Sequence, residues 1–163
     1  MDIKDFKSQT ISLENVINAR ELGGFETADG RKIRRGLLLR GAGLCNASDA
    51  DLLRLKETYQ LRRIFDFRME SEVRQAPDRS VDGAEYCWLP AMDPKTCENF
   101  NNYIAEGGFT DIEDVVRRGS SLPSVKEAAR TLYTSLVASD YTQEQYAKFM
   151  RGILDTDEGA VYW

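Results

Sequence analysis

Apolar positions along the chain follow two different spacings. Dense apolar runs over 37–39, 61–67 and 85–89 predict short strands, because bulky, β-prone side chains follow one another there. Elsewhere, apolar residues recur every three or four positions, over 52–59, 125–136 and 146–153, which predicts amphipathic helices. Strands separated by helices indicate an α/β fold, with parallel strands in a sheet that helices flank.

Turn and capping residues mark the boundaries of these elements. Asp29-Gly30 between two extended runs predicts a hairpin, because glycine accepts a positive φ. Ser48 is predicted to cap the first helix. Ser124 and Thr142 are each followed three residues later by Glu or Gln, so both are predicted to open a helix as part of a capping box.

Residues 91–123 have weaker periodicity than the rest of the chain. Met92-Asp93-Pro94 predicts a turn, and Gly107-Gly108 interrupts the stretch. Two interpretations remain open: a lid-like helical insertion over a cleft, or an irregular connection. In both, residues 1–163 form a single domain.

The chain ends on Gly159-Ala160-Val161-Tyr162-Trp163, an apolar run that favours a buried strand. A terminal strand can dock into a sheet, which is one interpretation. The other is that the strand leads into a segment that this chain lacks.

Composition excludes several classes of protein. The chain has 163 residues, a net charge of −5, three cysteines and no histidine. These counts argue against a Ser-His-Asp site, a zinc site or a disulfide scaffold, and we expect no metal and no cofactor. No apolar run is long enough to cross a membrane, and the N-terminus does not resemble a signal peptide, so we expect a cytoplasmic protein.

Charge is spread unevenly along this acidic chain. Residues 31–68 hold ten Lys and Arg against four Asp and Glu. This basic segment either focuses an anionic ligand or forms a solvated face with compensating acids nearby. The overall acidity argues against general binding of nucleic acid.

Polar residues follow successive predicted strands. They are Arg40, then Asp66 and Arg68, then Asp93. Each one alone is typical of a cap or a surface ion pair. Parallel strands, however, end at one edge of a sheet, so these side chains are also candidates for a shared crevice.

Four segments, taken in order, resemble the signatures of one family. They are Asn18-Ala19-Arg20-Glu21-Leu22-Gly23-Gly24-Phe25, Asp29-Gly30-Arg31, Arg35-Gly36 with Arg40, and Asp66-Phe67-Arg68 with Glu72. The set resembles the atypical, lipid-phosphatase-like tyrosine phosphatases of bacteria and fungi, a group that includes the mycobacterial secreted tyrosine phosphatases. The resemblance covers most of residues 14–93 and continues through the helices to Trp163.

The resemblance implies a cysteine-phosphatase-like sheet and phosphate-monoester hydrolysis through a phosphocysteine intermediate. In the family, the last strand runs into a His-Cys-x5-Arg loop, which would begin here after Trp163. The 163 residues hold no such segment. We therefore expect a chain that lacks the nucleophile and the C-terminal part of the domain, and that is inactive alone.

The resemblance also implies roles for the residues at the strand ends. Asp66 would line the site and serve as the general acid, a role that the loop Asp of the family could also fill. Arg40 and Arg68 would bind the substrate phosphate, with Asp93 as a further residue lining the site. For Arg68 the alternative is an ion pair with one of the glutamates that follow it, Glu70 or Glu72.

Substrates implied by the resemblance are phosphorylated proteins, on tyrosine or on serine and threonine, and phosphoinositides. The alternative is a non-catalytic module that ends natively at Trp163 and binds phosphorylated ligands without hydrolysing them. A last strand without its following helix would leave apolar surface exposed. We therefore expect a homodimer, strand exchange or association with a missing C-terminal segment.

Overall fold

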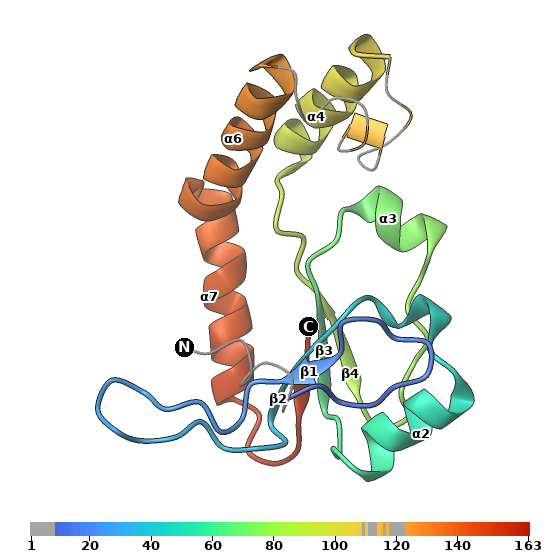
Figure 1. The fold of residues 1–163 in the computed structure, drawn as a ribbon, viewed down its shortest axis with the longest axis vertical. Helices are drawn as coiled ribbons and strands as arrows, with labels where there is room; N and C mark the ends of the chain where they lie inside the picture. The colour runs from blue at the N-terminus through green and yellow to red at the C-terminus, as the bar shows by residue number, and fades with distance from the viewer. Residues whose placement is uncertain (1–8, 109, 111–113, 116, 118–122) are drawn as a thin grey trace. The chain divides into compact units, whose positions relative to one another are not determined.

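The computed structural model describes residues 9–108, 110, 114, 115, 117 and 123–163. Five strands form one sheet in the order β1-β2-β5-β3-β4, and all neighbours are parallel except β1 and β2 (Figure 1). The strands are β1 (Arg20–Glu21), β2 (Leu38–Arg40), β3 (Arg63–Asp66), β4 (Glu85–Trp88) and β5 (Val161–Tyr162). The helices are η1 (Leu44–Asn46), α2 (Asp49–Glu57), α3 (Glu70–Gln75), α4 (Pro94–Glu106), α6 (Pro123–Ala138) and α7 (Asp140–Leu154). The predicted α/β class is therefore confirmed.

The chain divides into two compact units. The first comprises Met1–Leu89 with Phe149–Trp163 and holds the whole sheet, and the second comprises Pro90–Lys148. In the second unit, α4 covers 94–106 of the stretch predicted as a lid-like insertion. Residues 109, 111–113, 116 and 118–122 of that stretch lie outside the described residues, so the lid stays a prediction. Among the described residues, no helix is both long and apolar enough to span a membrane.

Strand β5 lies at the centre of the sheet, between β2 and β3. Val161 is in register with Leu38 on one side and with Arg63 on the other. Its N–H donates to the carbonyl of Leu37 at 2.8 Å, and the N–H of Arg62 donates to the carbonyl of Ala160 at 2.8 Å. The last apolar run of the chain therefore joins the two halves of the sheet.

The two faces of the sheet are packed differently. On one face, Leu39, Ile64 and Tyr162 are buried in a cluster with Leu44 of η1 and Leu55 of α2. On the other face, the ring of Phe149 in α7 makes edge contacts with three rings, at centroid distances of 5.0 to 5.2 Å. Those rings belong to Phe65, Phe67 and Trp163. Alternation along the strands thus gives each face its own apolar core.

Two predicted helix starts are wrong by a few residues. Helix α6 begins at Pro123, ahead of the predicted cap at Ser124. Helix α7 begins at Asp140, and the hydroxyl of Ser139, rather than Thr142, accepts the first-turn hydrogen bond, from the N–H of Thr142 at 3.1 Å. The Thr142 hydroxyl instead donates to the carbonyl of Ala91 at 2.7 Å. A tertiary contact therefore uses the side chain that local spacing had assigned to a cap.

The predicted cap at Ser48 is confirmed, and it is part of a larger network around Asp51. The Ser48 hydroxyl accepts from the N–H of Asp51 at 3.1 Å, and Asp51 accepts from the N–H of Ser48 at 3.0 Å. The Asp51 carboxylate also accepts from the N–H groups of Glu14 (2.6 Å) and Asn15 (3.0 Å). At 1% exposure, Asp51 fastens the segment before β1 to the start of α2.

Replacing Asp51 with Asn should lower the free energy of unfolding by about 2–3 kcal/mol, because one of the two oxygens that accept from three N–H groups becomes a buried NH2 donor. Burial alone would raise the pKa of Asp51, but these hydrogen bonds outweigh burial and lower it. The stabilisation is complete above the unfolded pKa of about 4 and disappears as the pH falls through the folded pKa. Urea unfolding at pH 7 and pH 3 measures both effects.

Asp49→Asn is the matched control, since Asp49 lies in the same first turn but is exposed. Its unfolding midpoint should stay close to that of the wild type. Equal losses of unfolding free energy in Asp51→Asn and Asp49→Asn would contradict the role given to Asp51.

Candidate active site

The four parallel strands end at one edge of the sheet, where ligands gather in open α/β sheets. Their last residues are Arg40 in β2, Tyr162 in β5, Asp66 in β3 and Trp88 in β4. Asp66 and Trp88 are in register with each other. Three predicted site residues, Arg40, Asp66 and Arg68, therefore come from this carboxyl edge.

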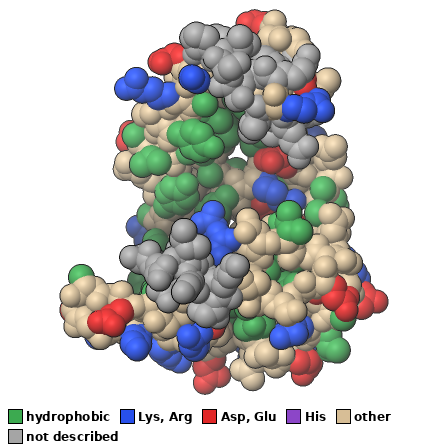
Figure 2. Space-filling model, in the orientation of Figure 1, with side chains coloured by type: hydrophobic (Ala, Val, Ile, Leu, Met, Phe, Trp, Pro, Cys, Tyr) green, Lys and Arg blue, Asp and Glu red, His purple; other side chains and the backbone are tan. Residues whose placement is uncertain are grey.

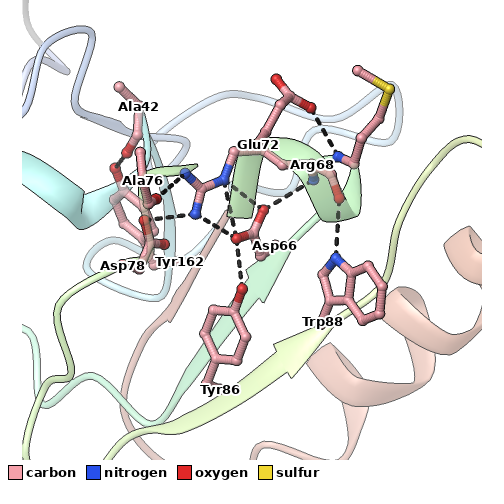
Figure 3. Close-up of polar contacts among 10 residues, drawn as sticks. Ala42, Asp66, Arg68, Glu72, Ala76, Asp78, Tyr86, Trp88 and Tyr162 are labelled. Atoms are coloured by element: carbon pink, nitrogen blue, oxygen red, sulfur yellow. Dashed lines mark hydrogen bonds and ion pairs between the residues drawn. The ribbon is translucent and has the colours of Figure 1, made fainter. Parts of the chain in front are cut away.

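Asp66 and Arg68 form the most connected polar contact of this edge (Figure 3). Nε of Arg68 donates to both carboxylate oxygens of Asp66, at 2.9 and 3.0 Å, and Nη2 donates to Oδ2 at 2.6 Å. The backbone N–H of Arg68 also donates to Oδ1 at 2.9 Å. The Asp66 side chain is only 4% exposed, so this is a largely dehydrated ion pair.

Arg68 has further partners on the loop that follows α3. Its Nη2 donates to Oδ1 of Asp78 at 2.8 Å, and its Nη1 donates to the carbonyl of Ala76 at 2.9 Å. Gly43 leaves room for this contact, because a Cβ there would lie 2.9 Å from Nη1 of Arg68 and 3.0 Å from Oδ1 of Asp78. The guanidinium therefore ties the end of β3 to the loop that follows α3.

The predicted alternative for Arg68, an ion pair with Glu70 or Glu72, is wrong. Glu70 pairs with Arg74 at the exposed surface, and Glu72 accepts from the N–H of Met69 at 2.8 Å to cap α3. The side chains nearest in sequence serve their own helix. The partner carboxylates of Arg68 come instead from Asp66 and Asp78.

Two aromatic residues of β4 complete the network (Figure 3). The hydroxyl of Tyr86 donates to Oδ2 of Asp66 at 2.6 Å, and Nε1 of Trp88 donates to the carbonyl of Arg68 at 3.0 Å. Burial and the hydrogen bond to Asp66 raise the pKa of Tyr86, so this phenol keeps its proton. Asp66 is thus surrounded by donors.

The two carboxylates beside Arg68 have opposite pKa shifts. Burial alone would raise the pKa of Asp66, but hydrogen bonds from Arg68 and Tyr86 outweigh it, and the net shift is downward. For Asp78, burial together with the nearby charge of Asp66 prevails over Arg68, and its pKa is raised. At neutral pH Asp66 is therefore an ionised acceptor, whereas a general acid must hold a proton at the working pH.

Arg40 differs from Arg68 in its surroundings. It is exposed at the end of β2, and within the described residues its side chain forms no ion pair. The N–H of Trp163 donates to the carbonyl of Leu39 at 3.1 Å, and Trp163 accepts from the N–H of Gly41 at 3.1 Å. Arg40, which lies between Leu39 and Gly41 in the sequence, is therefore next to Trp163 in the sheet.

Asp93 belongs to the second unit and caps α4. Its carboxylate accepts from the N–H of Thr96 at 3.0 Å and from the Thr96 hydroxyl. These hydrogen bonds outweigh the small effect of burial and lower the pKa of Asp93. A helix cap accounts for this residue, and its place in the site stays a prediction.

Half of the Lys and Arg residues in the basic segment 31–68 form ion pairs with acidic side chains. Figure 2 shows Lys and Arg side chains gathered where the hairpin of residues 24–34 projects at the lower left. Ion pairs to Asp or Glu engage five of the ten basic residues: Arg31, Arg35, Lys56, Arg63 and Arg68. Among the described residues, no cluster of three or more His, Cys, Asp or Glu suits a metal ion.

Sequence reasoning missed Tyr86 and Asp78. Tyr86 is two residues before Trp88, the residue in register with Asp66, so knowledge of the strand order would have placed its hydroxyl near Asp66. Asp78 follows Pro77 in a loop, and no spacing signal connects it to Arg68. Only the path of the loop after α3 brings it there.

Comparison with known proteins finds a matching family and a related protein. The sequence profile of the tyrosine phosphatase family matches residues 11–163, which includes every strand of the sheet. A protein of Cupriavidus necator that is named as a candidate tyrosine-protein phosphatase is 37% identical over 81 residues. That alignment covers 50% of this chain and 29% of the relative's length. The chain therefore matches a minor part of that relative.

Replacing Asp66 with Asn should lower the free energy of unfolding by about 2–4 kcal/mol, since Arg68 would keep only part of its counter-charge in a largely dehydrated site. Asp78→Asn should cost clearly less, because the pKa of Asp78 is raised and its ionisation therefore opposes folding. Urea unfolding at pH 7 measures this order.

The pH dependence of the two variants should have opposite signs. The loss of unfolding free energy in Asp66→Asn should shrink as the pH falls below about 4. The unfolding free energy of Asp78→Asn should rise relative to that of the wild type as the pH rises above about 4. Glu70→Gln, in an exposed pair, is the control and should behave like the wild type. A larger loss in Asp78→Asn than in Asp66→Asn would reverse the assignment.

Proposed function

Residues 11–163 match the tyrosine phosphatase family, so this chain belongs to that family, and we propose that its parent protein removes phosphate from tyrosine in proteins. The reaction would proceed through a phosphocysteine intermediate. The same chemistry also admits phosphoserine, phosphothreonine and phosphoinositide esters, as expected for the atypical, lipid-phosphatase-like members.

One observation carries this proposal: the central strand β5 leads to the carboxyl edge between Arg40 and the Asp66–Arg68 pair. By resemblance, a Cys-x5-Arg loop would continue from this strand. Backbone N–H groups of such a loop, at the start of a helix, bind an anion and lower the pKa of the cysteine. The loop would then lie in the middle of the predicted site.

The proposed reaction has two steps, transfer of the phosphoryl group to the cysteine and hydrolysis of the phosphocysteine. The cysteine thiolate attacks phosphorus, the bond from phosphorus to the tyrosyl oxygen breaks, and an acid protonates the departing phenolate. Water then hydrolyses the phosphocysteine, which restores the thiolate and releases inorganic phosphate. No metal or cofactor takes part in either step.

Different roles follow for the predicted site residues. Because Asp66 is ionised and fully hydrogen-bonded, we assign it to positioning Arg68 and the loop after α3, and we assign the proton for the leaving group to the loop Asp. Arg40, exposed beside Trp163, is the stronger candidate for contacting the substrate. Asp93 would contribute by starting α4, the helix in the proposed lid-like stretch.

The chain of residues 1–163 should show no turnover of p-nitrophenyl phosphate, because it contains no Cys-x5-Arg segment. The cysteines that it has are poor substitutes; for Cys87, burial and the nearby Glu85 raise the pKa of the thiol. The measurement is a release assay on purified chain of verified mass. Robust, saturable turnover would refute this prediction.

The matching experiment extends the chain through the coding sequence downstream of Trp163. The extended protein should hydrolyse p-nitrophenyl phosphate, and replacing the loop cysteine with serine should abolish the activity. A downstream sequence without a Cys-x5-Arg segment would sink the proposal. It would favour the second candidate, a module that binds phosphorylated ligands through Arg40 and does not hydrolyse them.

We also propose that the chain alone associates with a second copy or with a C-terminal segment of its own protein. Met150 and Leu154, one turn apart on α7, are 55% and 78% exposed, which supports an apolar contact there. Within the part of the chain that the structure describes, the three cysteines form no disulfide. For the setting we propose the cytoplasm.

Sedimentation of residues 1–163 should therefore detect a dimer at micromolar concentration. The double variant Met150→Gln, Leu154→Gln should shift the chain toward monomer by removing apolar area from that contact. A stable monomer of the unmodified chain would contradict self-association.

A further inference from the structure

Arg20 and Arg40 stand directly opposite each other on the antiparallel strands β1 and β2. Trp163 lies on the other side of Arg40, as its hydrogen bonds to the neighbours of Arg40 require. The three residues therefore form one row across the sheet at its carboxyl edge. Neighbours in such a row project toward the same face of a sheet.

The two guanidinium groups lack acidic partners within the described residues. Nη1 of Arg20 donates to the carbonyl of Asn18 at 2.8 Å, and no described carboxylate forms an ion pair with Arg20 or Arg40. Like charges directly opposite each other destabilise a sheet. Five basic residues of the chain segment 31–68 each have a carboxylate partner, whereas Arg40, from the same segment, has none among the described residues.

Local structure holds Arg20 in place at this edge. Asn18 adopts a positive φ of 63°, a conformation that asparagine tolerates better than most residues, and this turn presents its carbonyl to Arg20. The next residue, Glu21, accepts from the N–H of Gly36 at 2.6 Å and pairs with Arg35. The segment around Arg20 is thus anchored on both sides.

We propose that the Arg20–Arg40 pair binds an acidic side chain next to the phosphotyrosine of a protein substrate. The inference rests on the proposed function for the position of the reacting phosphate, and it adds a preference for the surrounding sequence. Guanidinium groups suit this task because they bind carboxylates in a planar, two-pronged geometry.

Strand spacing makes the distances compatible. Adjacent strands lie about 4.8 Å apart, so β2 and β1 lie about 5 and 10 Å from the axis of β5. An extended peptide rises about 3.3 Å per residue, so residues one to three positions from the phosphotyrosine fall in this range. Arg68, which Asp66 and Asp78 occupy, is not expected to take part.

The test uses residues 1–163 and two synthetic peptides without phosphate, one with glutamates around a central tyrosine and one with glutamines in their place. NMR would follow the arginine Nε–H signals during titration at low salt, where screening is weakest. The glutamate peptide should bind about fivefold more tightly than the glutamine peptide, as expected for exposed charge pairs. The signals of Arg20 and Arg40 should shift while that of Arg68 stays still.

Arg20→Gln should bring the affinity ratio of the two peptides close to one. Arg34→Gln is the matched control: Arg34 also lacks a described ion pair, but it lines a groove with Leu38 and Val161, at the start of β2 and β5. It should keep the fivefold preference. Urea unfolding confirms that both variants are folded.

Equal affinity of the wild type for the two peptides, no detectable binding of either, or equal loss in both variants would overturn the inference. Because the peptides carry no phosphate, this outcome does not depend on catalysis. Failure of the extended protein to hydrolyse p-nitrophenyl phosphate would instead overturn the proposed function.

Discussion

The backbone pairing of β5 is the constraint on which the rest of this structure depends. Only two residues, Val161 and Tyr162, form this strand, yet it lies between β2 and β3 and holds both in register. Without it the described sheet would separate into the pair β1–β2 and the pair β3–β4. Burying Tyr162, which is 2% exposed, also closes the core between η1, α2 and the sheet.

Electrostatics at the carboxyl edge follow from this pairing. With β3 beside β5, Asp66 comes to the edge and Arg68 turns back onto it, where Asp78 and the carbonyl of Ala76 complete the coordination of the guanidinium. Two carboxylates share one cation in a nearly dehydrated place, so one of them keeps a lowered pKa and the other does not. The result is a hydrogen-bonded network around Arg68 in which Asp66 is an ionised acceptor.

Arg40 and Arg68, the two arginines that the sequence suggested for phosphate binding, therefore differ in their side-chain partners. The Arg68 guanidinium donates to carboxylates within the protein, while Arg40 has no described ion pair and lies in a row with Arg20 and Trp163. An arginine that is hydrogen-bonded inside the protein and an exposed arginine thus follow two strands of one sheet. The ion-pair partners of the side chains, rather than their positions in the sequence, distinguish Arg68 from Arg40.

The sequence by itself determined the class of fold, the strands that carry Arg40 and Asp66, and the family. Apolar spacing and turn residues are local signals, and they survive in the folded chain, as the hairpin bridge between Glu26 and Lys32 illustrates. It also pointed to the apolar end of the chain as a strand. Tertiary structure alone decided that this strand is central, that Thr142 reaches Ala91 instead of capping a helix, and that Asp78 and Tyr86 surround the Asp66–Arg68 pair. These contacts join residues that are far apart in the chain or lie in a loop, and their energies depend on burial and on partners that no local pattern encodes.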